Sequence, residues 1–312
     1  MHEYSCNIRV KARKQRGSQR NKLRCNVLPT RSVGNKLRII LMNTVHPWFE
    51  GLPVRYVVGH RGAAGYCPEN TMESFRRAVE LGVHALEMDV HLSADGHLVV
   101  MHDECVDQTT DGTGPISGKS LAELEALDAG FGFSPDGGKT FPWRGRGLRI
   151  PTLDEVADEF PAHRLVIEIK PGGAATAEAL AAFCRRRNQP ARFLAGSSND
   201  DAMRFFRARA PDYATSASHG EARRFILGAM IACAPRPPLA YHALIVSRKH
   251  HGIPIVWSGM VSAAHARGLH VHVWTINDES TIRALYDIGV NGIVSDYPDR
   301  AVRVASAKPA CP

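Results

Sequence analysis

From residue 55 onward, short runs of β-branched and other apolar residues alternate with amphipathic stretches, several of which end at a glycine. This alternation is typical of βαβ units, in which crossover helices connect parallel strands. Eight runs have the length and composition of strands: residues 55–59, 85–91, 164–169, 192–195, 213–216, 243–246, 270–275 and 292–295. Because eight such units close into a barrel, we predict an α/β fold of the (β/α)8 (TIM) barrel class.

The segments between these runs have helical periodicity. The clearest are residues 71–81, 176–187, 200–210, 258–267 and 279–288. Gly82, Gly268 and Gly289 follow three of them, as is common for residues that end a helix. One segment breaks the alternation, because residues 96–100 return as a strand after the second run and residues 103–151 are rich in Gly and Pro. We predict that residues 103–151 form a small insertion over the barrel mouth.

The chain of 312 residues suits one barrel of about 250 residues, which we place at 53–312, with a basic arm before it. Residues 1–50 contain 11 of the 39 Lys and Arg residues against only Glu3 and Glu50, so this segment carries a net charge of +9. The rest of the chain has a net charge of −1, and we therefore expect no nucleic-acid binding by the barrel. Residues 1–52 lack periodicity, which predicts a disordered arm.

Three interpretations of the arm remain open: an inert extension or a start codon assigned too far upstream, a targeting segment, and a tether to an anionic surface. Met42 is an alternative start. The seven cysteines contain no C-x-x-C pair, which favours a reducing compartment. No run approaches the roughly 20 apolar residues of a membrane span. We expect a cytoplasmic protein, and the sequence does not predict its oligomeric state.

Carboxylates stand where two of the predicted strands approach their carboxyl ends. Glu87 and Asp89 are two residues apart, so both point to one side of their strand. Glu168 occupies the corresponding place in the third strand, and the carboxyl ends of barrel strands meet at one mouth. Three carboxylates in one partly buried place repel one another unless a cation lies between them. Their oxygen ligands favour Mg²⁺ or Ca²⁺.

Cationic residues and histidines accompany these carboxylates. Arg61 and Lys170 offer an alternative explanation, a salt-bridge network without metal. His60 ends the first strand, and His102 follows the strand that returns at residues 96–100. Two histidines and an Arg near a metal meet the requirements of phosphodiester cleavage, which needs a base, an acid and neutralisation of the phosphoryl charge.

These residues resemble, in order, the motifs of glycerophosphodiester phosphodiesterases. The matching motifs are His60-Arg61-Gly62, Pro68-Glu69-Asn70-Thr71, Glu87-x-Asp89, Asp95-Gly96, His102-Asp103, Glu168-x-Lys170 and Trp274-Thr275-x-Asn277. The likeness extends over about residues 56–299 and implies a barrel of the phosphatidylinositol-phosphodiesterase-like kind. Gln108 and Ser295 depart from the pattern, since the family often has Arg and Thr there.

The resemblance implies a role for each matching residue. Glu87, Asp89 and Glu168 correspond to metal ligands, and His60 and His102 to the acid and base, in either order. Arg61 and Lys170 correspond to phosphate contacts, and Trp274 to a wall of the substrate pocket. Glu69 would add an oxygen to the metal or support its ligands, whereas we expect Asn70 to cap the helix that opens at Thr71.

The implied reaction is metal-dependent hydrolysis of a glycerophosphodiester to glycerol 3-phosphate and an alcohol. Three alternatives remain. A lysophospholipase D or sphingomyelinase-D-like enzyme would need an apolar groove, for which Phe131, Phe133, Phe141 and Trp143 of the insertion are candidates. A metal-independent phosphoinositide phospholipase C is disfavoured by Glu168. An idle barrel whose basic arm binds nucleic acid or an anionic surface is disfavoured by the intact motifs.

Overall fold

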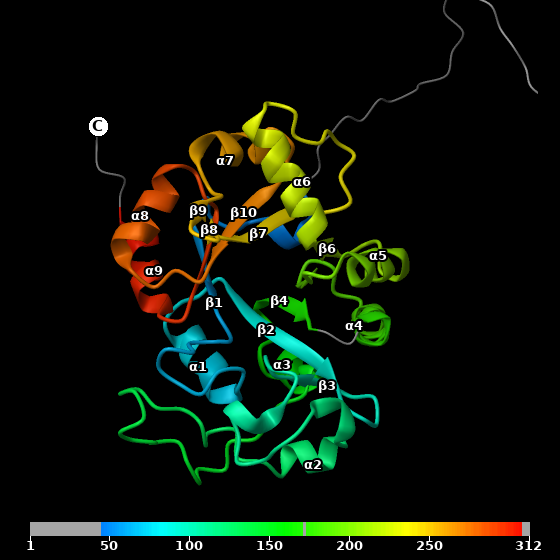
Figure 1. Ribbon diagram of the computed structural model, residues 1–312, viewed down its shortest axis with the longest axis vertical. Coiled ribbons are helices and arrows are strands. Elements are labelled where there is room, and N and C mark those ends of the chain that lie inside the picture. Colours follow the sequence, from blue (N-terminus) through cyan, green and yellow to red (C-terminus); the bar gives the residue numbers. More distant parts are fainter. Residues whose placement is uncertain (1–44, 171–172, 308–312) are drawn as a thin grey trace, which may run out of the picture. The chain divides into compact units, whose positions relative to one another are not determined.

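The computed structural model describes residues 45–170 and 173–307. All eight predicted runs are strands: β1 (Tyr56–Gly59), β2 (Ala85–Leu92), β4 (Arg164–Ile169), β5 (Phe193–Gly196), β6 (Ala214–Thr215), β7 (Ala243–Ser247), β10 (His270–Trp274) and β11 (Gly292–Ser295). They are parallel and hydrogen-bonded in the order β6-β5-β4-β2-β1-β11-β10-β7. A parallel bridge between Ser216 and Ala243 joins the two ends of this order. The strands therefore form a nearly closed barrel, which confirms the predicted fold (Figure 1).

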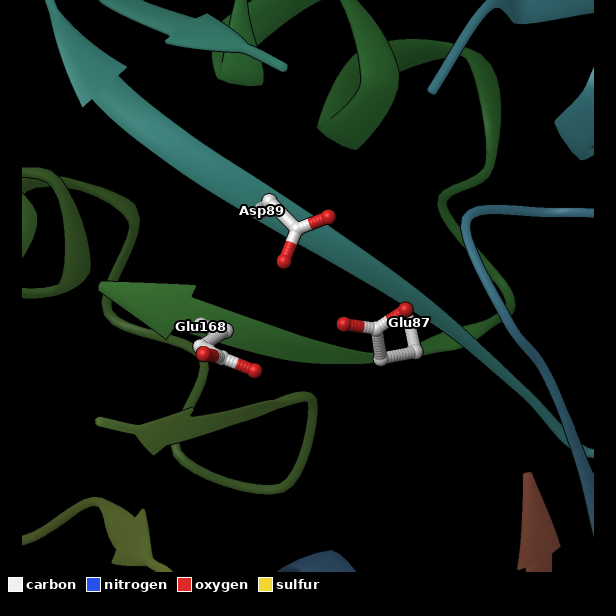
Figure 2. A group of neighbouring side chains, drawn as sticks. All are labelled: Glu87, Asp89 and Glu168. Atoms are coloured by element: carbon white, nitrogen blue, oxygen red, sulfur yellow. The ribbon is translucent and has the colours of Figure 1, made fainter. Parts of the chain in front are cut away.

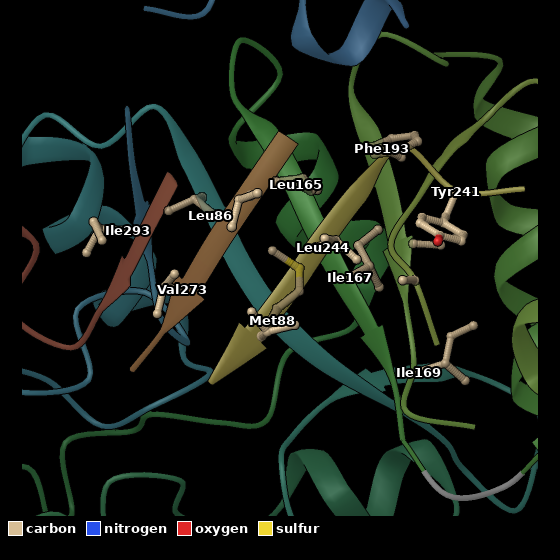
Figure 3. Close-up of a cluster of buried hydrophobic side chains, with 14 of the residues drawn as sticks. Leu86, Met88, Leu165, Ile167, Ile169, Phe193, Tyr241, Leu244, Val273 and Ile293 are labelled. Carbon is tan, nitrogen blue, oxygen red and sulfur yellow. The ribbon is translucent and has the colours of Figure 1, made fainter. Parts of the chain in front are cut away.

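Side chains along each strand alternate between the barrel interior and the surrounding helices. On β2, Met88 and Val90 pack in the outer core, whereas Ala85 belongs to a separate core inside the barrel. Figure 3 shows outward side chains of several strands gathered into one apolar layer. Glu87 and Asp89 have the parity of Ala85, so they point into the barrel above its inner core.

The segment before β1 closes the inner core at the amino ends of the strands. It contains the 3-10 turn η1 (Pro47–Phe49), whose Trp48 is fully buried. Trp48 Nε1 donates to the carbonyl oxygen of Arg192 at 3.1 Å, and Arg164 Nε donates to the carbonyl oxygen of Trp48 at 2.7 Å. The prediction that the disordered arm reaches residue 52 is therefore wrong for residues 45–52, because their aromatic rings fill the end of the barrel. Residues 1–44, with the alternative start Met42, lie outside the described residues.

The helices surround the strands. They are α1 (Met72–Glu80), α3 (Leu153–Glu159), α4 (Gly173–Arg187), α5 (Asp200–Arg209), α6 (His219–Met230), α7 (Ser258–His265), α8 (Glu279–Asp287) and α9 (Pro298–Ser306). The five predicted helices agree with α1, α4, α5, α7 and α8 to within three residues at each end. The sequence patterns did not reveal α3, α6 and α9. Within the described stretches, no helix has both the length and the apolar character needed to cross a lipid bilayer.

Two small additions interrupt the barrel pattern. The first begins with β3 (Leu98–Val100), which pairs antiparallel with β2, and continues through η2 (Val106–Gln108), η3 (Ile116–Gly118) and α2 (Leu121–Glu125). It has a small core of its own, to which Val106, Ile116 and Leu124 belong. The second is the hairpin of β8 (Lys249–His250) and β9 (Ile253–Pro254) after β7. The four cysteines of the described residues, Cys67, Cys105, Cys184 and Cys233, are free thiols.

Candidate active site

Three carboxylates meet at the carboxyl ends of β2 and β4. Glu87 and Asp89 project from the same side of β2 toward Glu168 of β4 (Figure 2). Asp89 and Glu168 are register partners in the parallel ladder. One oxygen from each of the three carboxylates lies within 4.8 Å of the others. The spacing in the sequence thus produces the predicted cluster.

Two cationic side chains neutralise part of this cluster. Lys170 Nζ lies 3.0 Å from Asp89 Oδ1 and 3.1 Å from Glu168 Oε1. Arg61 donates from one terminal nitrogen to both oxygens of Glu69 at 2.9 Å. The Nε of Arg61 lies 3.3 Å from Asp89 Oδ2 without hydrogen-bond geometry. Burial raises the pKa of Asp89, but Lys170 and Arg61 outweigh burial and hold that pKa below its usual value.

Glu87 is the carboxylate that these cations leave without a side-chain partner. It is buried, and among the described residues its Oε2 accepts only from the backbone N–H of Arg61 at 2.9 Å. Burial and the charge of Asp89 raise the pKa of Glu87 to about 8. With all groups ionised, the four carboxylates of the site and its two cations leave a formal charge of −2. The site therefore fits a hard divalent cation, because Arg61 and Lys170 leave part of its negative charge unbalanced.

His60 is oriented by a hydrogen bond to Asp296, which directly follows β11. Its Nδ1 donates to Asp296 Oδ1 at 2.6 Å, and Asn277 Nδ2 donates to the other oxygen of Asp296 at 2.7 Å. Because a carboxylate only accepts, the proton of the neutral ring is on Nδ1 and the lone pair is on Nε2. Burial lowers the pKa of His60, but the hydrogen bond to Asp296 and the charge of Glu87 outweigh burial and raise it above 6.5.

His102 has the same arrangement, since its Nδ1 donates to Asp103 Oδ1 at 2.8 Å. A carboxylate that fixes the tautomer of a histidine is a recurring device of acid–base sites. Sequence reasoning gave no role to Asp296, Asn277 or Asp103. The signals were present, because Asp103 follows His102 directly and Asp296 follows the last predicted strand.

The backbone around Arg61 has an unusual conformation. Arg61 and Asn70 have positive φ angles of 48° and 57°, which are uncommon outside glycine and cluster at functional sites. A side chain at Gly62 would lie 2.5 Å from the backbone of Ser74 in α1. The segment after β1 can therefore approach α1 this closely only because residue 62 is a glycine. The prediction that Asn70 caps α1 is wrong, because Thr71 is the N-cap of this helix. Asn70 Nδ2 instead donates to Asp89 Oδ2 at 2.9 Å.

A cavity of about 730 Å³ opens at this cluster. The predicted site residues that line it are His60, Arg61, Glu87, Asp89, His102, Glu168, Lys170 and Trp274. Glu69 and Asn70 lie beside it and contact Arg61 and Asp89. The structure therefore brings all ten predicted residues together.

The apolar side of the cavity is not where the sequence suggested. None of Phe131, Phe133, Phe141 and Trp143 lines it. Phe131 and Phe141 instead pack on the guanidinium of Arg144, 4.1 and 3.4 Å from their ring centres. Side chains of α6, β7 and the β8–β9 hairpin form the apolar wall. The insertion contributes Thr109, Ala129 and Ile150 to a much smaller cavity next to His102.

Comparisons with known proteins agree with this geometry. The sequence profile of the "Glycerophosphoryl diester phosphodiesterase family" matches residues 60–300. A glycerophosphodiester phosphodiesterase of Caldanaerobacter subterraneus subsp. tengcongensis is 31% identical over 80% of this chain and 96% of the relative. One of Bacillus subtilis is 30% identical over 78% and 83%. The structure of an Oleispira antarctica phosphodiesterase with the product sn-glycerol-3-phosphate superposes with a TM-score of 0.66 and 29% identity, covering 83% of this chain and 99% of that chain.

Proposed function

This chain belongs to the glycerophosphoryl diester phosphodiesterase family, and on that premise we propose that it hydrolyses glycerophosphodiesters to glycerol 3-phosphate and an alcohol. The main support for the proposal is that His60 and His102 line the same cavity as the acidic cluster, and that an aspartate orients each of these histidines. The product bound to the Oleispira antarctica relative supports the same reaction class.

Glu87, Asp89 and Glu168 would hold the divalent cation, Mg²⁺ or Ca²⁺, because these three carboxylates approach one another and no cationic side chain in the described part of the chain pairs with Glu87. When bound, the cation would neutralise charge on the phosphoryl oxygens. Asn70 keeps Asp89 in place through its hydrogen bond. Glu69 supports the site indirectly, because it holds the guanidinium of Arg61.

His60 and His102 carry the proton transfers. One Nε2 takes the proton of the attacking hydroxyl, and the other imidazole donates a proton to the alkoxide as its bond to phosphorus breaks. The attacking hydroxyl belongs either to the glycerol moiety, which gives a cyclic phosphate that water then opens, or directly to water. Both routes add one water in total and release glycerol 3-phosphate and the free alcohol, and trapping a cyclic product would distinguish them.

Arg61, Lys170 and Trp274 position the substrate. The ammonium group of Lys170 and the guanidinium of Arg61 lie among the carboxylates, where they can also face the phosphoryl oxygens. Trp274 ends β10 and is 45% exposed, so its ring is available as a wall for the alcohol or glycerol part.

The test is release of glycerol 3-phosphate from glycerophosphocholine and glycerophosphoethanolamine by metal-stripped protein, with and without Mg²⁺ or Ca²⁺. We expect release only after metal is restored. Replacing His60 or His102 by Ala should lower kcat by about 100-fold or more. His97→Ala is the control, because His97 is exposed on the β2–β3 turn and does not line the cavity. Unchanged turnover in both active-site variants would refute the assignment.

A further inference from the structure

The active-site cavity continues past the acidic cluster over the next two strands. Leu194 of β5 and Ala214 of β6 belong to the core inside the barrel. Gly196 and Ser216 lie two positions later, so they point into the barrel above that core, and both line the cavity. Gly196 is the register partner of Glu168. Because neighbouring strands are about 4.8 Å apart, Ser216 lies roughly 10 Å from Glu168 across the sheet.

The hydroxyl group of Ser216 is available to a ligand in the cavity. Ser216 is only 4% exposed, and its Oγ has no hydrogen-bond partner among the described residues. A Cβ at residue 196 would lie 2.9 Å from this Oγ, so Gly196 leaves the space in front of the hydroxyl open. A buried hydroxyl without a partner is destabilising. A ligand that accepts a hydrogen bond from Ser216 would remove this cost.

Further hydrogen-bond donors surround this end of the cavity. Helix α6 begins at His219, and Arg223 lies one turn later; both residues line the cavity. His250 of β8 also lines it, and its ring centre lies 6.2 Å from that of His219. An imidazole ring carries at least one N–H donor, and a guanidinium group carries five. Donors from the end of β6, from α6 and from β8 therefore meet in one place.

Arg223 is not neutralised by the protein. Its guanidinium group forms no hydrogen bond or ion pair with any residue that the structure describes. Two acidic residues lie beside the start of α6, but Glu221 pairs with Arg207 at 2.7 Å, and Asp200 accepts from the backbone N–H of Gly220 at 2.9 Å. Neither of them lines the cavity, whose acidic residues all come from β2 and β4. An unpaired Arg that lines a cavity is suited to bind an anion, because its planar fork matches a phosphate or a carboxylate.

We propose that Ser216, Arg223 and the imidazole groups beside them form a subsite for a second phosphate, carried by the alcohol part of the substrate. This inference rests on the proposed phosphodiesterase function of the same site. The diester phosphate lies at the acidic cluster, and the second phosphate lies at Arg223, roughly two strand spacings away. A phosphate group accepts several hydrogen bonds at once, as the donors from three elements require. The enzyme therefore prefers glycerophosphodiesters whose alcohol is itself phosphorylated.

The experiment uses pairs of synthetic diesters of glycerol 3-phosphate with ethanediol, butanediol or hexanediol. In each pair the terminal hydroxyl of the diol is either free or phosphorylated. Release of glycerol 3-phosphate in the presence of Mg²⁺ gives kcat/KM for each compound. At the linker length that reaches the subsite, the terminal phosphate should raise kcat/KM by about tenfold or more, as expected for charge-assisted hydrogen bonds. Added salt should lower this ratio, because Arg223 is exposed.

Arg223→Gln tests the cationic group of the subsite. The ratio of kcat/KM between the phosphorylated and the free diester should fall to about twofold or less. Ser216→Ala should lower the same ratio by about threefold, because one neutral hydrogen bond is lost. A variant that is merely damaged would lose activity on both members of a pair and would keep the ratio. Arg224→Gln is the matched control, since Arg224 is the next residue, is also exposed and does not line the cavity.

The possible outcomes distinguish this inference from its premise. Hydrolysis of the diesters with no advantage for a terminal phosphate at any linker length would overturn the subsite and leave the proposed function standing. An equal fall of the ratio in Arg224→Gln would also overturn the subsite, because the preference would then belong to the positive surface of α6 in general. Absence of hydrolysis of every diester with Mg²⁺ or Ca²⁺ would overturn both.

Discussion

At the residue scale, Glu87 is the side chain whose surroundings most clearly favour a bound cation. Asp89 and Glu168 both contact Lys170, and Glu69 contacts Arg61. Within residues 45–170 and 173–307, the carboxylate of Glu87 accepts a hydrogen bond only from the backbone N–H of Arg61. Its pKa of about 8 follows from burial and from the charge of Asp89. A group held in this way is destabilising when ionised unless a cation balances it.

Glu87→Gln should therefore separate stability from metal binding. In metal-free protein, the variant should be as stable as the natural chain or more stable, because a repelled carboxylate is replaced by a neutral amide. Adding Mg²⁺ or Ca²⁺ should raise the Tm of the natural protein and leave that of Glu87→Gln almost unchanged. Thermal unfolding with a metal titration measures both effects. Glu80→Gln is the control, because Glu80 is exposed and pairs with Arg77; equal metal stabilisation in both variants would remove Glu87 from the ligand set.

Asp296→Asn should lower the pKa of His60. The amide oxygen of Asn can still accept from Nδ1, but the negative charge that raises this pKa is lost. The limb of the pH–rate profile that belongs to His60 should therefore move to lower pH, whether His60 is the base or the acid. We also expect kcat to fall by roughly 100-fold.

NMR titration of the His60 ring proton in the metal-free variant measures the shift directly. Asp287→Asn serves as a control, since Asp287 is exposed, pairs with Arg55 and is not among the charges that shift the pKa of His60. A titration that is identical in Asp296→Asn and in the natural protein would contradict the role given to Asp296.

At the element scale, η1 and α6 extend the barrel beyond its eight repeated units. The turn η1 places Trp48 at the amino ends of the strands, where its ring also lies 6.1 Å from that of His272. Helix α6 presents apolar side chains to the cavity at the opposite ends of the strands. Thus η1 closes the inner core, and α6 forms part of the cavity wall.

Trp48→Ala should destabilise the barrel by about 3–5 kcal/mol, because it removes a fully buried ring that packs against Phe49 and His272. Urea unfolding measures the change. Val54→Ala, at a side chain that is 80% exposed, should change the free energy of unfolding by no more than about 0.5 kcal/mol. A similarly small effect for Trp48→Ala would mean that the turn does not contribute to the stability of the barrel.

At the scale of the whole molecule, one buried histidine and two half-buried histidines link folding to pH. Burial lowers the pKa of His272 to about 3 and the pKa values of His270 and His242 to about 4. Tyr56 Oη lies 2.6 Å from Nε2 of His272, and the Nδ1 of this ring has no partner among the described residues. In the unfolded chain these histidines titrate near 6.5.

The sign of the pH effect follows from these values. Between about pH 6.5 and 4 the unfolded chain binds more protons than the folded one, so the free energy of unfolding falls as the pH falls through this window. Each histidine contributes at most about 1.4 kcal/mol per pH unit. Urea unfolding at several pH values should give a shallower dependence for His272→Phe, whatever its stability at neutral pH. His97→Gln, at an exposed site, should keep the original slope; an unchanged slope in His272→Phe would contradict the buried, neutral state of His272.

Sequence patterns alone predicted the strands, five of the helices and the ten residues that lie in or beside the cavity. These features are local, because β-branched runs favour extended backbone and residues two apart on a strand share a face. Glu87 and Asp89 therefore point into the barrel whichever strands lie beside them. The ends of parallel strands must also gather at one mouth, which brings Glu168 to the same place.

Local patterns could not predict the contacts that depend on closure of the barrel. His60 and Asp296 are 236 residues apart, and they meet because β1 and β11 become neighbours when the sheet closes. Residues 45–52 have no periodicity, so their burial depends on the open end of a barrel that other segments build. Helix α6 was missed for a similar reason. Phe225 and Ile226 pack in the outer core, whereas Leu227 and Met230 are exposed and line the cavity, so the apolar residues of α6 do not form a single buried face.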